Sequence, residues 1–142
     1  MRSTGPGSAR PSLNTRDTFD RLFPALFGGD RAALLELLDE DVVWHLPPFA
    51  AAEPMRGRDA VVDFLIKTPA KLYEAGSLKL EPELSAVEGD RALLLGWMTG
   101  TTARGKPYKN RYVFAVRVRA GRIAEAWELL DSKLFLEQLQ QR

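Results

Sequence analysis

Residues 108–130, YKNRYVFAVRVRAGRIAEAWELL, alternate between apolar and polar side chains on both sides of a short Ala120-Gly121 turn. A period of two is typical of β-strands, and two strands joined by such a turn form an antiparallel hairpin. In the second strand, Glu128 shares a face with two alanines and Leu130, because side chains alternate across a strand. Burial among such neighbours raises a carboxyl pKa toward the range useful for proton transfer. Glu128 is therefore a candidate catalytic acid or base; the alternative is a sheet-edge glutamate paired with an arginine.

The first strand of this hairpin has one basic face and one mixed apolar and polar face. The mixed face carries Tyr108, Asn110, Tyr112, Phe114, Val116 and Val118. We expect this face to point inward and to contribute Asn110, Tyr112 and Phe114, together with Leu130 of the next strand, to a pocket for a largely hydrophobic ligand. The alternative is that Asn110 and Tyr112 only satisfy hydrogen bonds of the core.

His45 lies in another expected strand, DVVWHLP at residues 41–47, where it shares a face with Val43. It is the only histidine, and its unperturbed pKa lies near neutrality. If this strand and the last strand line the same concavity, His45 and Glu128 converge on one substrate or water and divide the acid and base roles. Val43 would then line the pocket as well. The alternative is a hydrogen-bonded histidine of the core.

Two further positions are candidates for function. Trp97 and Leu95 share a face of the strand expected over residues 92–103, where the indole would form a flat wall for a ring system or simply fill the core. Asp131 follows the last strand and is expected to cap a C-terminal helix, Ser132 to Leu139, rather than to serve as a second catalytic carboxylate.

The first half of the chain has the periodicity of helices. A stripe from Phe19 to Leu26 predicts an amphipathic helix that ends at Gly28-Gly29, with a kink or an early break at Pro24. Asp30 can cap a second helix, and a third opens near Arg58 and is expected to be disrupted at Pro69. From Leu78 onward the pattern is that of an antiparallel meander.

Helices followed by strands indicate the α+β class, with helices covering one face of a strongly curved, mostly antiparallel sheet around an open-mouthed pocket. The 142 residues suffice for one core, so residues 15–142 are expected to form a single domain. Residues 1–14 are rich in Ser, Gly and Pro and predict a disordered tail or an expression remnant.

Composition excludes several classes of function. Twenty Lys and Arg residues balance nineteen Asp and Glu residues, which gives no reason to expect nucleic acid or a membrane surface as a partner. Without cysteine, and with one histidine, thiolate metal sites and a cysteine nucleophile are excluded, and a zinc site or a Ser-His-Asp triad is not expected. No apolar run is long enough to span a membrane or to form a secretory signal, so we expect a cytoplasmic protein with a small hydrophobic partner and no metal or organic cofactor.

Taken together, these residues resemble the nuclear transport factor 2-like superfamily, in its SnoaL-like polyketide cyclase and limonene epoxide hydrolase branches. The resemblance rests on the order and spacing of FGGDRAALLELL, DVVWHLP, MRGRDAVVDFL and GRIAEAWELLD. It implies a cone-shaped, cystatin-like α+β barrel with three helices in the N-terminal half, a deep apolar pocket and, commonly, a homodimer.

The resemblance also implies roles for single residues. In both branches an aspartate of the last strand acts as acid or base, and Glu128 occupies its position by order and spacing. His45 looks like the position at which the epoxide hydrolase has a water-binding asparagine. Asn110 and Tyr112 look like pocket-lining positions.

Departures from the family patterns narrow the activity. The epoxide hydrolase has an arginine and an aspartate on the middle strand, where this chain has Leu95 and Trp97, which argues against ordinary epoxide hydrolysis. Ketosteroid isomerases have an aspartate where Leu46 stands, so steroid isomerisation is disfavoured as well.

The sequence therefore predicts a cofactor-independent cyclase or isomerase of secondary metabolism, such as antibiotic biosynthesis, that acts on a polyketide-like small molecule by acid-base catalysis. A non-catalytic ligand-binding or dimerisation domain of the same fold is the alternative. Epoxide hydrolase-like or dehydratase activity with an altered site is a further one.

Overall fold

The structure is a computed structural model that describes residues 14–139, so the tail expected at residues 1–14 lies outside the described residues except for Asn14. In chain order the elements are α1 (Thr15–Phe27), α2 (Arg31–Leu37), β1 (Leu38–His45), β2 (Met55–Arg56), α3 (Arg58–Leu72), β3 (Lys79–Glu88), β4 (Arg91–Thr101), β5 (Pro107–Arg119), β6 (Arg122–Leu130) and α4 (Ser132–Leu139). Within residues 14–139, no helix has the length and apolar character needed to cross a membrane.

Short polar side chains start three of the described helices. Asn14, Asp30 and Asp131 each accept a hydrogen bond from the backbone N–H three residues further on, at 2.8, 3.1 and 3.0 Å. Such caps satisfy N–H groups that the first helical turn leaves without a partner. The predicted capping role of Asp131 is confirmed.

Both internal prolines are accommodated within their helices. Helix α1 continues through Pro24 to Phe27, and α3 continues through Pro69 to Leu72, so the disruption expected at Pro69 is wrong. Pro69 lies in the last turn of α3, where its missing N–H removes a single hydrogen bond. The hydrogen bond that closes the last turn of the helix is retained, because the N–H of Tyr73 donates to the carbonyl of Pro69 at 3.0 Å.

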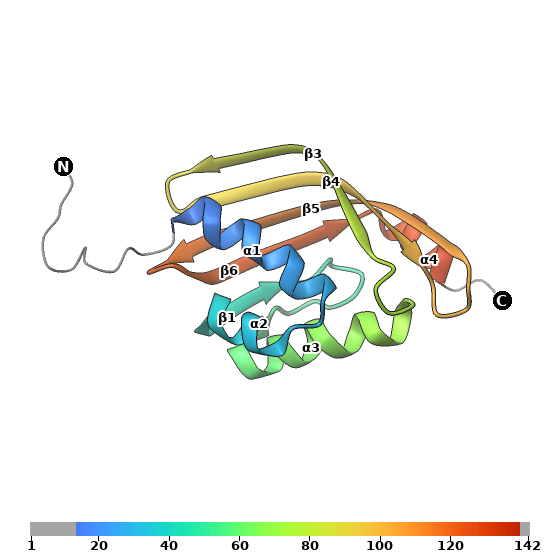
Figure 1. Cartoon of the computed structure of the whole chain (residues 1–142), viewed down its shortest axis with the longest axis horizontal. Helices are drawn as coiled ribbons and strands as arrows, with labels where there is room; N and C mark the ends of the chain where they lie inside the picture. The colour runs from blue at the N-terminus through green and yellow to red at the C-terminus, as the bar shows by residue number, and fades with distance from the viewer. Residues whose placement is uncertain (1–13, 140–142) are drawn as a thin grey trace, which may run out of the picture.

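The six strands form one sheet in the order β2-β1-β6-β5-β4-β3 (Figure 1). Strands β3 to β6 make the predicted antiparallel meander, whereas β1 joins β6 in parallel. Strand β2, which the sequence pattern did not indicate, pairs with β1 at the edge. In Figure 1, α1 crosses the middle strands while α2 and α3 lie beside β1, so the three helices cover one face of the curved sheet.

The hairpin between β5 and β6 determines which β6 side chains face the helices. Arg119 pairs with Arg122, and the two-residue turn between them has φ values of 52° at Ala120 and 77° at Gly121. Positive φ at both positions is the geometry of a type I′ turn, whose twist matches that of the strands. Val118 pairs with Ile123 but Arg117 pairs with Glu125, so a β-bulge at Ala124 shifts the register of β6 by one residue. As a result of the turn and this bulge together, Phe114 pairs with Glu128, and their side chains lie on the same face.

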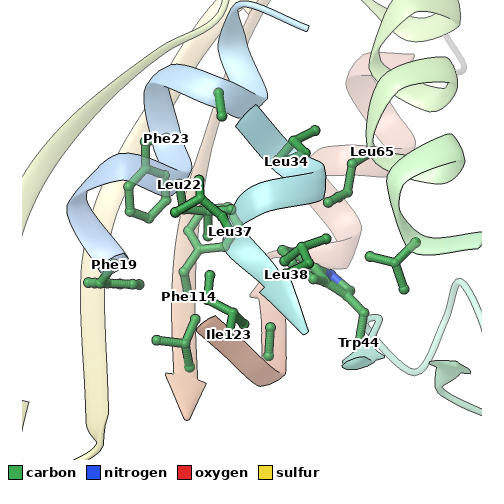
Figure 2. Close-up of a cluster of buried hydrophobic side chains, with 14 of the residues drawn as sticks. Phe19, Leu22, Phe23, Leu34, Leu37, Leu38, Trp44, Leu65, Phe114 and Ile123 are labelled. Carbon is green, nitrogen blue, oxygen red and sulfur yellow. The ribbon is translucent and has the colours of Figure 1, made fainter. Parts of the chain in front are cut away.

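The core lies between that face and the helices. Figure 2 shows side chains of α1 and α2, among them Phe19, Leu22 and Leu34, packed against Phe114 and Ile123 of the sheet. The mixed face of β5 is buried along its whole length, with the members Tyr108, Asn110, Tyr112, Phe114, Val116 and Val118. The predicted inward face of this strand is thus confirmed.

Candidate functional site

An apolar cavity of about 200 Å³ lies at the end of the core nearest α4. Its walls come from α1, the end of β1 and the loop after it, α3, the three strands β4 to β6, and α4. The lining side chains that carry a polar group are Thr68, Tyr73, Tyr112, Glu128 and the indole of Trp44. No Lys, Arg or His is among the residues that line it in the described part of the chain.

Glu128 is the only carboxylate that lines this cavity in the described chain. It is half-buried, and its Oε1 accepts a hydrogen bond from Nε1 of Trp44 at 3.2 Å. Burial raises the pKa of Glu128, and the Trp44 hydrogen bond opposes this rise only in part. The strand face predicted for Glu128 is confirmed. A carboxyl with a raised pKa in a largely dry cavity can both take and return a proton near neutral pH.

A second polar feature of the cavity is a chain of phenol hydroxyls. The hydroxyl of Tyr112 lies 2.7 Å from that of Tyr108, and Nδ2 of Asn110 donates to the Tyr108 oxygen at 3.2 Å. Burial raises the pKa of Tyr108, Tyr112 and the neighbouring Tyr73, so these phenols stay protonated. Tyr112 lines the cavity beside Phe114 and Leu130, as expected, and can donate a hydrogen bond to a ligand oxygen.

Asn110 is fully buried behind the cavity and does not line it, which differs from its predicted place as a pocket residue. Its amide is used up by protein partners. Besides Tyr108, Nδ2 donates to the carbonyl of Asp131 at 3.0 Å, and Oδ1 accepts from the backbone N–H groups of Arg111 and Asp131 at 2.7 and 3.2 Å. Asn110 therefore fits the alternative interpretation given above, in which it satisfies hydrogen bonds of the core and does not bind a ligand.

The expected convergence of His45 with Glu128 does not occur. His45 pairs in register with Trp127, stacks on its ring at a centroid distance of 5.1 Å, and places Nε2 2.7 Å from Oε2 of Glu125. Hydrogen bonds from His45 and then Arg117 hold the pKa of Glu125 below its usual range. Because neighbouring residues of a strand point to opposite faces, His45 and Val43 lie on the outer face and Trp44 lines the cavity.

Trp97 and Leu95 also lie on the outer face of the sheet and do not line the cavity as predicted. The Trp97 ring is flanked by Nζ of Lys109 at 5.0 Å and by the guanidinium of Arg111 at 5.2 Å. These cations belong to the basic face of β5, and β4 turns Leu94 and Met98 inward instead. Trp97 is therefore a surface platform for cations and not a wall of the cavity.

Trp44, Tyr73 and Phe135 are among the lining residues that the sequence analysis missed. A signal for Trp44 was available, because it shares a strand face with Val42 and Leu46, and this face is more apolar than that of Val43 and His45. Tyr73 follows α3, and Phe135 comes from α4. Their approach to the cavity depends on how these helices pack, which local periodicity does not encode.

A curved sheet that encloses an apolar cavity together with covering helices is the fold of the nuclear transport factor 2-like proteins. An NTF2-like protein of unknown function from Burkholderia pseudomallei shares it, with a TM-score of 0.77 at 22% identity over 91% of this chain and 99% of that chain. More narrowly, residues 19–126 match the SnoaL-like domain, and the chain belongs to the SnoaL-like family.

Among solved structures, two forms of IdmH are similar to this chain. A loop truncation variant is 30% identical, covers 88% of this chain and 98% of that chain, and has a TM-score of 0.73. Wild-type IdmH from Streptomyces antibioticus, provisionally described as a polyketide cyclase, is 26% identical over 91% of this chain and 100% of that chain, with a TM-score of 0.75. A comparison with curated proteins finds no match.

Proposed function

We propose that this protein is a cofactor-independent cyclase or isomerase that moves a proton on a hydrophobic, polyketide-like substrate with Glu128 as the acid-base group. The observation that carries the proposal is the position of Glu128, a carboxyl with a raised pKa and one Trp44 hydrogen bond inside an apolar cavity. The similarity to IdmH supports the substrate class.

The cavity geometry supports a two-part mechanism. The Glu128 carboxylate removes a proton from the carbon next to a substrate carbonyl, and Tyr112 donates a hydrogen bond to the oxygen that becomes negative. In an isomerisation, Glu128 returns the proton to another carbon. In a cyclisation, the enolate carbon attacks a second carbonyl, and Glu128 returns the proton to the new alkoxide oxygen.

The lining favours a neutral substrate. Because no cation lines the cavity in the described chain, a carboxylate or phosphate brought next to Glu128 would have no counter-charge. A cavity of about 150 Å³ can hold a benzene molecule, so the present volume, about 200 Å³, suits roughly one or two fused rings.

A simple bicyclic ketone tests the chemistry without knowledge of the natural substrate. The protein should catalyse exchange of the α-hydrogens of 1-tetralone for deuterium in D2O, followed by NMR. Glu128→Gln should reduce the catalysed rate by about 10²-fold or more. Glu125→Gln is the matched control, because it makes the same change on the same strand but on the outer face. Equal rates for the Glu128→Gln variant and the wild type would remove Glu128 from the mechanism.

A binding protein of the same fold is the second candidate. It is favoured by the presence of a single carboxylate and no cation among the described cavity residues, so no second charged group assists Glu128. The same feature weighs against epoxide hydrolase-like or dehydratase chemistry that needs a paired acid and base. Saturable thermal stabilisation by 1-tetralone without deuterium exchange would support ligand binding alone.

We also propose that the outer face of the sheet forms a homodimer interface. Two apolar rows cross β3 to β6: Ala86, Leu93, Ala115 and Trp127 in one, and Leu84, Leu95, Val113 and Leu129 in the next. Leu84 and Leu129, which lie at the two ends of the second row on β3 and β6, are 58% and 49% exposed, so the row presents apolar surface to solvent at both of its ends.

A second copy is the occupant that the charges of this face fit. The row beyond the apolar patch carries both signs, in Glu88, Arg91, Arg117 and Glu125, as a two-fold interface requires of a self-complementary surface. Sedimentation velocity should show a dimer that Leu129→Glu converts to a monomer. Leu136→Glu, at an exposed position of α4, is the control and should leave the dimer intact. A monomeric wild type would contradict the interface.

A further inference from the structure

Helix α4 covers one side of the cavity but is weakly anchored by apolar packing. Phe135 of α4 lines the cavity, and its ring centroid lies 5.4 Å from that of Phe49 in the loop after β1. No side chain of α4 is fully buried. An element with little buried apolar surface opens at a lower free-energy cost than the sheet beneath it. Only Phe135 and Leu139 of α4 pack against the core, and both are partly buried, so the closed position of α4 depends on its polar contacts as well.

Two side-chain amides hold α4 against β5. At the far end of the helix, Gln138 accepts from the N–H of Lys109 at 2.7 Å and donates to its carbonyl at 2.8 Å. The last residue of β6, Leu130, pairs with Tyr112, so Lys109 of β5 has no partner residue in β6. The side-chain amide of Gln138 makes the two hydrogen bonds that a neighbouring strand would otherwise make. At the start of the helix, Asn110 bonds both the N–H and the carbonyl of Asp131.

The Asn110 amide, which holds the start of α4, is also linked to the cavity by hydrogen bonds. Asn110 donates to the Tyr108 hydroxyl, which lies 2.7 Å from that of Tyr112, and Tyr112 lines the cavity. One hydrogen-bond network thus joins the first residue before α4 to the hydroxyl that faces a ligand. Members of such a network influence one another's strength, so a change at one end is felt at the other.

We infer that α4 is the movable cover of the cavity and that Asn110 is a positioning residue, which ties the closed position of α4 to the Tyr112 hydroxyl through Tyr108. A ligand oxygen that bonds Tyr112 then favours the closed cover, and a closed cover favours the ligand by the same factor. The inference rests on the cavity of the proposed function but not on proton transfer by Glu128, so its tests do not measure catalytic activity.

Trp44 reports on opening, because it lines the cavity and is 1% exposed. Trp97→Phe and Trp127→Phe leave Trp44 as the only tryptophan among the three of the chain. Acrylamide that enters the cavity when α4 opens would quench the phosphorescence of this tryptophan. The chain has no cysteine, so Phe49→Cys and Phe135→Cys can be joined specifically by a short bis-maleimide.

The cross-link should lower the acrylamide quenching rate constant of Trp44 by about tenfold, because it blocks local opening of α4. The control is the same protein with both cysteines capped by N-ethylmaleimide, which has the same substitutions but a free helix. Equal quenching of the cross-linked and capped forms would overturn the assignment of α4 as the cover.

Hydrogen exchange tests the role of Asn110. Tyr108→Phe removes the hydroxyl between Asn110 and Tyr112 and should speed amide exchange in α4 by about fivefold, the effect of one hydrogen bond, while exchange in β4 stays unchanged. Gln138→Ala, at the exposed end of α4, should act in the same direction. Thr68→Val, which alters a cavity residue outside this network, is the control. If Tyr108→Phe matches Thr68→Val in α4, the coupling through Asn110 is overturned.

Discussion

Replacement of Glu128 by glutamine is expected to stabilise the protein at neutral pH, by an amount that grows as the pH rises. Burial raises the pKa of Glu128 in the folded protein, whereas in the unfolded chain the group titrates near the ordinary glutamate value of 4.5. Between these two pKa values the folded protein keeps a proton that the unfolded chain has lost. The free energy of unfolding of the wild type therefore falls as pH rises from 4.5 through the folded pKa.

The magnitude follows from the single proton involved. Linkage of one proton gives a slope of at most about 1.4 kcal/mol per pH unit in this window, and no slope above the folded pKa. Glutamine does not titrate, and its carbonyl oxygen can still accept the hydrogen bond that Trp44 donates to Oε1 of Glu128. The difference in unfolding free energy between Glu128→Gln and the wild type should thus rise with pH and then level off.

Urea unfolding followed by circular dichroism, from about pH 4.5 to pH 8, measures this difference. Glu125→Gln is the informative control, because the pKa of Glu125 is lowered by its hydrogen bonds from His45 and Arg117. Glu125 contributes stability that is fully present above its unfolded pKa and is lost only as pH falls through the lower folded pKa, so Glu125→Gln should lower the unfolding free energy by an amount that is nearly constant over this pH range. Parallel pH profiles for Glu128→Gln and the wild type would show that the Glu128 carboxyl is hydrated, and would refute the reasoning.

Three further substitutions have expected outcomes. Tyr112→Phe removes the donor that faces a ligand oxygen and should lower the rate of tetralone exchange by about 10²-fold, with little change in binding of the ketone by titration. Trp44→Phe removes the hydrogen bond that lowers the pKa of Glu128, so the rise of the exchange rate with pH should shift to higher pH. Ala120→Asn places a residue that tolerates positive φ in the β5–β6 turn and should raise the unfolding free energy by about 0.5–1 kcal/mol in the urea assay.

The fold and part of the site could be predicted from sequence because they depend on short-range patterns. The alternation within β5 identified the inward face of Tyr112 and Phe114, and the alternation in β6 after its β-bulge placed Glu128 with Leu130, since strand periodicity decides which residues share a face within a regular stretch. The capping residue Asp131 was recognisable for the same reason, because a cap acts within one helical turn.

The errors concern which of the two faces of β1 and of β4 points inward, and how elements distant in the sequence meet. In β1 the single histidine drew attention to the face of His45, although the neighbouring face with Trp44 is more apolar and lines the cavity. In β4 a tryptophan was expected inside, yet Trp97 lies outside between two cations of β5. The contribution of Phe135 follows from the docking of α4, which side-chain amides fix and periodicity does not reveal.

The two-residue turn at Ala120 and Gly121 has a consequence for anyone who redesigns this scaffold. If one residue were inserted there and the ladder closed again one step out of phase, every β6 side chain would change sides. Trp127 would then enter the hollow, and the carboxyl of Glu128 would be displayed on the outside of the sheet. The length of this turn and the β-bulge at Ala124 together determine that Glu128 faces the cavity, so both should be kept unchanged in a redesign.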